Sequence, residues 1–212
     1  MTTAKICGLK TPETVAVSVA GGASHIGFAL FPRSPRAVTA GEAAALAAPA
    51  RGRTLIVALM VDPTDAEVAE AAQVLRPDLI QLHGRETPDR AARVRALSGA
   101  GIIRALPVSS GADLDAAAAY EETADHLLFD AAPPKGADRP GGHGEPFDWT
   151  ILAGRRFARP WFLAGGLTPG NVTQAVRTSR APLVDVSSGV EVARGLKDAA
   201  LIEAFLAAVR RA

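Results

Sequence analysis

Two side chains in this sequence carry groups suited to proton transfer, the thiol of Cys7 and the carboxyl of Asp130. A thiolate can serve as a base or a nucleophile, and a carboxyl group can serve as an acid. Each residue ends a short apolar run. A cysteine in a strand is also a common small apolar residue, and an aspartate there can cap a helix or pair with an arginine. The residues alone leave both interpretations open.

Three more polar residues lie near the ends of other apolar runs: Arg36 and His83 after theirs, and Asp185 in the last part of its run. Arg36 lies in the proline-containing segment Ser34-Pro35-Arg36, where a guanidinium could hold a carboxylate through two parallel hydrogen bonds. A solvated surface arginine is the alternative. His83 could face a ligand or have a structural role. Asp185 could contact a substrate or orient the loop that follows it.

Two small-residue turns near the C-terminus are suited to an anion. Glycines at Gly165 and Gly166 let backbone amides approach a ligand closely, and the Ser188-Gly189 turn follows the next apolar run. Two tight connecting turns are the alternative interpretation. Because both turns occur together, the pattern favours a phosphate site.

The sequence gives no sign of a metal or a nucleotide cofactor. Its 4 histidines are dispersed, and no cluster has the spacing of metal ligands. It contains no phosphate-binding GxxxxGK[ST] motif, and Gly165-Gly166-Leu167 is not a dinucleotide fingerprint. We therefore expect a small-molecule substrate handled without cofactor or metal.

Eight short apolar runs position these residues. The runs are nearly continuous, which is typical of strands in a parallel sheet that is covered on both faces. They are Ala4–Cys7, Ile26–Leu30, Leu55–Met60, Leu79–Leu82, Ile102–Leu106, His126–Phe129, Trp161–Ala164 and Leu183–Val186. Helix-start signals lie between them. Thr-Pro pairs begin at Thr11, Thr87 and Thr168, and pairs with capping-box spacing occur at Thr39 with Glu42 and Thr64 with Glu67.

Eight repeats of strand then helix predict an α/β fold, a single-domain (β/α)8 TIM barrel over residues 1–212. A doubly wound open sheet is the structural rival. In a barrel, the first and sixth strands lie on opposite sides of the ring, so Cys7 and Asp130 would flank a substrate at the C-terminal face. The Pro- and Gly-rich segment 131–146 would lie on that face, as a lid or as an ordinary insertion.

Composition excludes several classes of function. The 212 residues carry 23 basic and 22 acidic side chains, so no global field attracts nucleic acid or an anionic membrane. A lone cysteine cannot form an internal disulfide. No apolar run approaches the roughly 20 residues that a membrane span needs, and the first residues lack the pattern of a signal peptide. We expect a cytoplasmic protein.

Seven motifs run in order along nearly the whole chain: Lys5-Ile6-Cys7-Gly8, Ser34-Pro35-Arg36, Gln81-Leu82-His83-Gly84, Phe129-Asp130, Gly141-Gly142-His143-Gly144, Leu163-Ala164-Gly165-Gly166-Leu167 and Asp185-Val186-Ser187-Ser188-Gly189-Val190-Glu191. As an ordered set they resemble the phosphoribosylanthranilate isomerases of tryptophan biosynthesis. Many members of that family have Gly-Gly-Thr-Gly in the fifth motif, where this sequence has Gly-Gly-His-Gly. The sequence departs from the family pattern at this loop, and the departure bears on how the loop closes.

The resemblance implies an Amadori rearrangement of N-(5-phosphoribosyl)anthranilate without cofactor or metal, in a monomer or homodimer. By the same resemblance, Asp130 is the general acid and Cys7 the general base. Arg36 meets the anthranilate carboxylate, and the glycine-rich turns hold the phosphate. The alternatives are another phosphosugar barrel, such as an indole-glycerol-phosphate synthase or a histidine-pathway sugar isomerase, and a phosphoribosyl-ligand binder without turnover.

Overall fold

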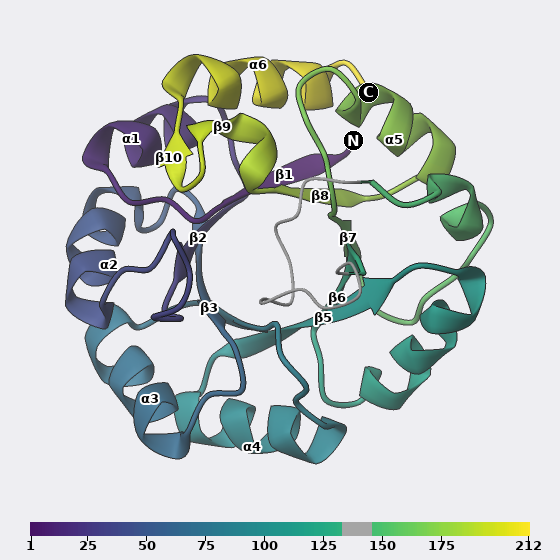
Figure 1. Cartoon of the computed structure of the whole chain (residues 1–212). Coiled ribbons are helices and arrows are strands. Elements are labelled where there is room, and N and C mark those ends of the chain that lie inside the picture. Colours follow the sequence, from purple (N-terminus) through teal and green to yellow (C-terminus); the bar gives the residue numbers. More distant parts are fainter. Residues whose placement is uncertain (133–145) are drawn as a thin grey trace.

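Eight parallel strands close into a barrel in the order in which they occur along the chain (Figure 1). This architecture comes from a computed structural model, which describes residues 1–132 and 146–212. The strands are β1 (Thr3–Cys7), β2 (His25–Ala29), β3 (Leu55–Met60), β4 (Leu79–Leu82), β5 (Gly101–Val108), β6 (His126–Ala131), β7 (Trp161–Leu163) and β8 (Leu183–Val186). The predicted TIM barrel is confirmed, and the open-sheet alternative is wrong because β8 pairs with β1.

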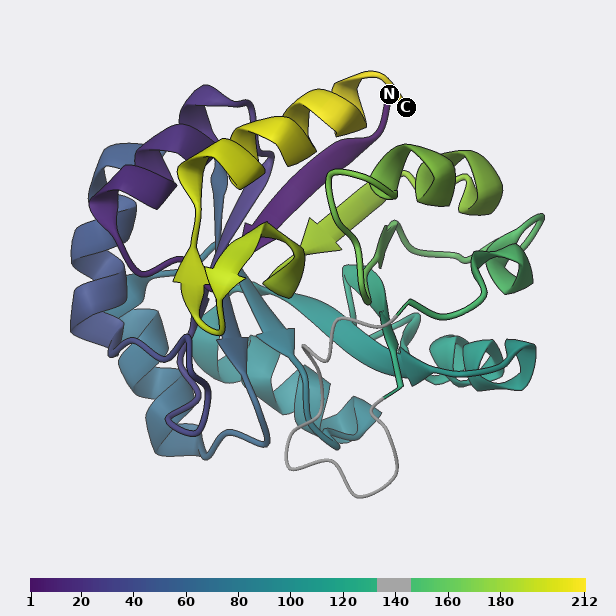
Figure 2. The same ribbon diagram turned by 45° about the horizontal axis from the view of Figure 1, so that its top comes forward.

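Helices surround the barrel on its outside (Figures 1 and 2). The α-helices are α1 (Pro12–Ala20), α2 (Ala40–Ala47), α3 (Asp65–Glu70), α4 (Pro88–Ser98), α5 (Val172–Ser179) and α6 (Ala199–Arg210). The 3-10 helices are η1 (Ala48–Ala50), η3 (Gly111–Tyr120), η4 (Trp149–Leu152) and η5 (Ser188–Val190), and η2 (Ala71–Leu75) is a π-helix. The helical connections after β5 and β6 are therefore 3-10 rather than α, which the repeat pattern did not predict.

A small antiparallel hairpin, β9 (Glu191–Ala193) and β10 (Leu196–Lys197), follows β8 and was also not predicted. The hairpin follows β8 and the short η5 turn, so it lies at the end of the barrel where the strands finish (Figure 2). The two chain termini lie close together beside α6 and β1 (Figures 1 and 2). The site described below is built around this hairpin and the neighbouring strand ends.

Four of the five predicted helix starts are confirmed. Thr11 and Thr87 accept a hydrogen bond from the third residue of their helices, each with proline at the first helical position. Capping boxes form at Thr39 with Glu42 and at Thr64 with Glu67. The start predicted at Thr168 is wrong: α5 begins at Val172, because the side chain of Asn171 ties Thr168 and Gly166 into the loop before it.

Two apolar clusters follow from the alternation of side chains along the strands. The larger cluster lies between the barrel and its helices and includes Ile6, Phe129 and the inward face of α6, on which Phe205 and Leu206 are buried. The smaller one fills the barrel interior, with members such as Val57, Ile103 and Leu128. The interior is therefore a packed core rather than an open channel.

Within the described residues, no helix is long and apolar enough to cross a membrane. Most of the Pro- and Gly-rich segment, and with it the Gly141–Gly144 motif and the lid interpretation, lies outside the described residues.

Two histidines pack against Phe162 inside the barrel, with ring centroids of His25 and His126 at 5.2 and 5.7 Å from that of the phenylalanine. His25 is 4% exposed, and its Nε2 has no hydrogen-bond partner among the described residues. Burial, with smaller contributions from Lys5 and His126, lowers the pKa of His25 from 6.5 to about 4. The folded state therefore holds this imidazole neutral.

This histidine should make the fold sensitive to acid. Because its pKa is lower in the folded chain, the unfolded chain binds more protons between pH 6.5 and 4, and stability falls as pH decreases through that window. We expect His25→Gln to remove on the order of 2 kcal/mol of the stability loss between pH 7.5 and 4.5. Urea titrations of both proteins at both pH values measure this, and equal losses in the two proteins would contradict it.

Candidate active site

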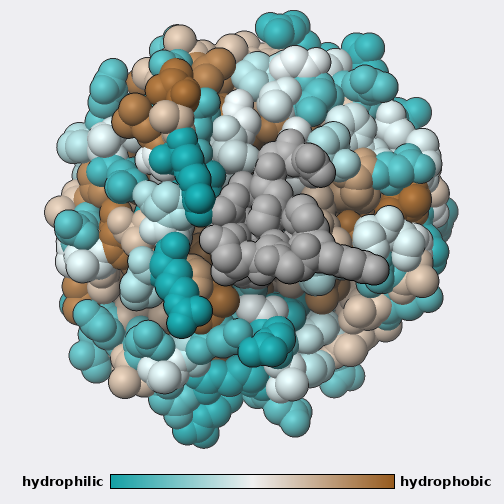
Figure 3. Space-filling model, in the orientation of Figure 1, coloured by the Kyte–Doolittle hydropathy of each residue, from teal (hydrophilic) through white to brown (hydrophobic). Residues whose placement is uncertain are grey.

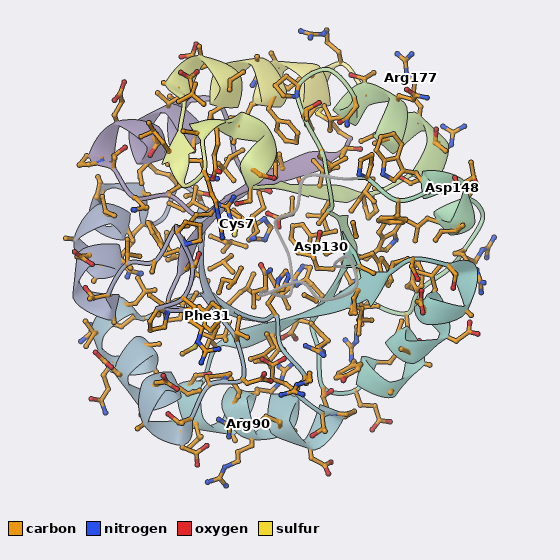
Figure 4. All side chains as sticks on the ribbon, viewed as in Figure 1. Cys7, Phe31, Arg90, Asp130, Asp148 and Arg177 are labelled. Carbon is orange, nitrogen blue, oxygen red and sulfur yellow. The ribbon has the colours of Figure 1, made fainter. Side chains whose placement is uncertain are left out.

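Cys7 and Asp130 lie at the same end of the barrel and come from opposite sides of its ring. Cys7 ends β1, and Asp130 is the penultimate residue of β6. Figure 4 shows both near the centre of the barrel mouth, away from Arg90, Arg177 and Asp148 at the periphery. Figure 3 shows hydrophilic residues around the rim of this face with hydrophobic residues between them. The two expected proton carriers are therefore placed on facing walls of one mouth.

Beneath the Cys7 thiol lies a buried ion pair. Lys5, two residues earlier on β1, points to the same side as Cys7, is fully buried, and donates from Nζ to Asp185 Oδ1 at 2.9 Å. Gly27 on β2 leaves space for both side chains. A Cβ at that glycine would lie 3.0 Å from Cys7 Sγ and 3.2 Å from Lys5 Cε. Thiol, ammonium and carboxylate thus form one cluster.

The charges of this cluster act on the thiol in opposite directions. Burial raises the pKa of Cys7 above its ordinary value of 9.0, whereas the Lys5 ammonium opposes the increase. Burial alone would lower the pKa of Lys5, but Asp185 and Cys7 outweigh it and raise that pKa. The resting site therefore holds a neutral thiol above a charged lysine.

Asp130 is held by a histidine from β4's end. His83 Nε2 lies 3.2 Å from Asp130 Oδ2, and His83 Nδ1 lies 2.8 Å from the side-chain nitrogen of Gln81. Both partners of this contact are only slightly exposed, His83 at 13% and Asp130 at 14% of the side chain. The carboxyl is thus oriented while one face remains open toward the mouth.

Arg36 lies across the start of the loop that follows Cys7. A Cβ at Gly8 would lie 2.6 Å from Arg36 Cδ, so only glycine there leaves room for the arginine. The guanidinium makes a two-point contact with Glu191, from Nε at 2.6 Å and from Nη2 at 2.9 Å. Arg36 is therefore a buried, fixed group rather than a solvated one, and its carboxylate partner in the free protein is Glu191.

Lys197, from the β9–β10 hairpin, shares that carboxylate. Its Nζ donates to Glu191 Oε1 at 2.7 Å and to the Ser187 carbonyl at 2.8 Å. Ser187 Oγ donates to the Cys7 carbonyl at 3.3 Å. Burial would raise the pKa of Glu191, but hydrogen bonds from Arg36 and Lys197 outweigh it and bring the pKa to about 2. This network joins the hairpin to the end of β1.

The two small-residue turns lie against each other. A Cβ at Gly189 would lie 1.8 Å from the Leu167 carbonyl oxygen, which only glycine permits. Gly165 and Gly166 have left-handed backbones with φ of 80° and 66°. A Cβ at Gly165 would meet the Ala131 nitrogen at 2.5 Å. Ser188 and Gly189 begin η5, and the first amides of a helical turn have no partner within it. The arrangement is suited to an anion at the β7 and β8 ends.

Arg104 lies inside the fifth apolar run and does not reach the mouth. β5 continues past it to Val108, two residues beyond the expected end of the run at Leu106. Arg104 is buried, with Nη1 at 2.6 Å from Glu86 Oε2 and the guanidinium over the ring of Tyr120. Glu86 also accepts from the backbone of Asp62 and Gly84. This cluster therefore shapes the loops after β3 and β4.

Sequence reasoning did not identify three residues that build the site: Lys5, Glu191 and Lys197. Lys5 carried a usable signal, because a lysine two residues before Cys7 in an apolar strand must share its face. Glu191 and Lys197 carried none, since the hairpin that brings them to Arg36 was not predicted. The spacing of residues along the sequence likewise did not predict the contact of Asp185 with Lys5 or that of Arg36 with Glu191.

The fold and the site together define a TIM-barrel enzyme whose functional groups gather at the C-terminal ends of the strands. Residues 4–208 match the family model described as N-(5'phosphoribosyl)anthranilate (PRA) isomerase. The chain therefore belongs to the phosphoribosylanthranilate isomerase family.

Individual relatives agree with the family model. The chain is 57% identical to N-(5'-phosphoribosyl)anthranilate isomerase of Caulobacter vibrioides, over 99% of this chain and 96% of the relative. It is 49% identical to the protein of the same name from Mesorhizobium japonicum, over 98% and 95%.

Solved structures agree as well. The phosphoribosyl anthranilate isomerase of Thermotoga maritima superposes with a TM-score of 0.89 at 31% identity, covering 100% of both chains. A structure of a phosphoribosyl anthranilate isomerase in complex with reduced 1-(o-carboxyphenylamino)-1-deoxyribulose 5-phosphate gives 0.86 at 29% identity, again covering 100% of both chains.

The environment of Cys7 makes a prediction that needs no substrate. The thiol is 4% exposed and its pKa is raised, while the thiolate is the reactive form. We expect iodoacetamide at pH 7.5 to alkylate the native chain about tenfold or more slowly than the same chain unfolded in urea. Because Cys7 is the single cysteine, intact-mass spectrometry reports it alone. Equal rates would show a thiol that is free and ionised.

Proposed function

We propose that this chain catalyses the Amadori rearrangement of N-(5-phosphoribosyl)anthranilate to 1-(2-carboxyphenylamino)-1-deoxyribulose 5-phosphate, in tryptophan biosynthesis. Membership of the isomerase family supports the reaction. The observation that carries the mechanism is the placement of a thiol and a carboxyl on facing walls of one mouth, the thiol above the Lys5–Asp185 pair and the carboxyl beside His83. An acid on one side and a base on the other are what a sugar needs for ring opening and proton abstraction.

In the first step, Asp130 protonates the ring oxygen of the ribose. The bond from C1 to that oxygen breaks, the nitrogen lone pair forms a C=N bond to C1, and an open-chain iminium results. In the second step, Cys7 takes the proton from C2, and the electron pair of that C–H bond forms a C1–C2 double bond, which neutralises the nitrogen. The product is an enolamine that tautomerises to the ketone, with no net oxidation or reduction.

The base must be a thiolate when it takes the C2 proton. Burial favours the neutral thiol in the free protein, and Lys5 is the charge that favours the thiolate. A thiolate formed beside the Lys5–Asp185 pair gains an ammonium neighbour without exposing either charge to water. In this proposal Lys5 stabilises the reactive form of Cys7, and Asp185 keeps Lys5 in place from below.

Binding groups lie on either side of the proton carriers. Arg36, with its Nη1 not engaged by Glu191, is the proposed partner of the anthranilate carboxylate. The turns at Gly165-Gly166 and Ser188-Gly189 are the proposed phosphate site, as the turns after the seventh and eighth strands are in many TIM barrels. His83 and Asp185, proposed from the sequence as substrate contacts, are here bound to Asp130 and Lys5. Fixed contacts at both ends of the substrate would hold C2 between acid and base.

The environment of the lysines argues against a synthase that uses catalytic lysines at strand ends. Lys5 is fully buried and bound to Asp185, and Lys197 is bound to Glu191 and Ser187. A pure binder has no need of a cysteine poised above a lysine. A cytoplasmic location and a monomeric or homodimeric state stay predictions.

Removing either proton carrier should abolish most turnover while leaving the fold intact. We expect Cys7→Ala and Asp130→Asn each to lower kcat by about two to four orders of magnitude, the usual contribution of a positioned acid or base. The loss of substrate fluorescence follows the reaction. Asp89→Asn, an exposed change in the first turn of α4, is the control. Near-normal kcat in Cys7→Ala would remove it as the base.

Arg36 should act mainly on binding. We expect Arg36→Ala to raise KM about tenfold or more, and Arg36→Lys to rescue it only in part, because an ammonium cannot reproduce the two-point contact. Arg33→Ala, an exposed arginine in the same loop, is the matched control. An unchanged KM in Arg36→Ala would contradict its role as the carboxylate partner. Growth of a tryptophan auxotroph lacking this isomerase tests the reaction itself.

A further inference from the structure

Gln81 is a buried polar side chain to which the proposed reaction gives no role. It lies on β4, is fully buried, and shares the interior face of that strand with His83, two residues further along. Its side-chain nitrogen is 2.8 Å from His83 Nδ1. Its Oε1 is buried and has no hydrogen-bond partner among the described residues. A buried amide with one end unpaired and the other on an imidazole needs an explanation.

The contact determines which nitrogen of His83 carries the proton. An amide NH2 group has only donors, so His83 Nδ1 must be the acceptor and its proton lies on Nε2. Turning the amide over would place Oε1 at Nδ1 and leave two buried N–H donors unpaired. Unpaired buried N–H groups are rarer and more costly than an unpaired carbonyl oxygen. The pocket thus selects one amide orientation.

His83 transmits this choice to Asp130. With the proton on Nε2, the imidazole presents an N–H group to the Asp130 carboxyl, whose Oδ2 lies 3.2 Å away. The oxygen that faces this N–H group is the poorer site for the acidic proton of Asp130, so that proton belongs on Oδ1. In the opposite tautomer, Nε2 would be a lone pair, and a protonated Asp130 would donate to His83 instead of to a ligand.

We propose that Gln81 is a positioning residue that fixes the tautomer of His83, so that Asp130 presents its proton from Oδ1 to the substrate. The inference rests on the proposed function, in which Asp130 is the acid. After the proton has left, the same Nε2–H group faces the Asp130 carboxylate and favours its negative charge. Among the described residues, the Gln81 side chain hydrogen-bonds to His83 and to neither proton carrier, so it acts through the imidazole.

The test combines histidine tautomers with kinetics. In the ¹⁵N-histidine-labelled full chain, which has 4 histidines, long-range ¹H–¹⁵N spectra distinguish the tautomers, and His83→Asn assigns the signals. We expect the His83 tautomer with its proton on Nε2. In Gln81→Glu, whose carboxylate can only accept, Nδ1 should be protonated. There kcat should fall about tenfold or more, with KM changed less than about threefold, because binding groups are untouched.

Gln81→Met keeps the volume of the side chain but removes its hydrogen-bond donor. This variant tests the same inference if Gln81→Glu folds poorly. We expect it to give a mixture of tautomers and a smaller fall in kcat. Gln73→Glu makes the same chemical change at an exposed position and should change neither spectrum nor rate. A wild-type His83 protonated on Nδ1 would overturn the inference, as would a wild-type kcat in both Gln81 variants. If the wild-type chain does not turn over phosphoribosylanthranilate, the proposed function fails instead, and the spectra still decide the tautomer.

Discussion

The ion pair between Lys5 and Asp185 lies where the barrel closes. Lys5 on β1 and Asp185 on β8 are direct partners in the register that joins the last strand to the first. A 2.9 Å hydrogen bond between them crosses the interior at this junction. A buried pair of this kind adds little net stability, but losing one partner costs about 3–5 kcal/mol, because the other charge stays buried. The closure of the barrel and the floor beneath Cys7 therefore depend on the same two residues.

Glycine provides the space that this closure leaves for the site. Gly8, Gly27 and Gly189 each stand where a Cβ would collide with an arginine, with the cysteine and lysine, or with the neighbouring loop. The side chains of the mouth thus pack directly onto backbone. The positions of these side chains are set by strands rather than by loops alone. Positions on strands are more precise, and they hold Cys7 and Asp130 on facing walls.

The fold was predictable because its signals are local and repeated. Apolar runs located the eight strands, and threonine caps located most helix starts. Two kinds of feature were not predictable. The 3-10 helix Gly111–Tyr120 has an alanine-rich sequence that favours an α-helix, so packing on β5 overrides propensity. The hairpin after β8 is short, and its turn at Gly195 packs on the Pro35 carbonyl, a contact between segments far apart in sequence.

The same distinction applies to the site. Cys7, Asp130 and His83 were identifiable because each stands at or beside the end of a strand, and the barrel brings strand ends together. Their partners were not, because pairing depends on distance in space. Arg36 illustrates the difference: its type and its rigid loop predicted a carboxylate partner, while the partner found in the structure is Glu191, 155 positions later. Sequence shows what a side chain can bind, and the fold decides which group reaches it.

The charges of the mouth fit the anionic substrate proposed for this chain, although its formal net charge is only +1. Lys5 and Asp185 neutralise each other. Arg36 and Lys197 share the single carboxylate of Glu191, whose pKa of about 2 keeps it ionised at neutral pH. Two cations on one carboxylate leave one positive charge, held nearly without solvent beside Cys7. In a medium of low effective dielectric, one such charge attracts an anion more strongly than several on the surface. A basic surface is therefore unnecessary, and the adjoining glycine-rich turns can meet a second anionic group with neutral backbone amides.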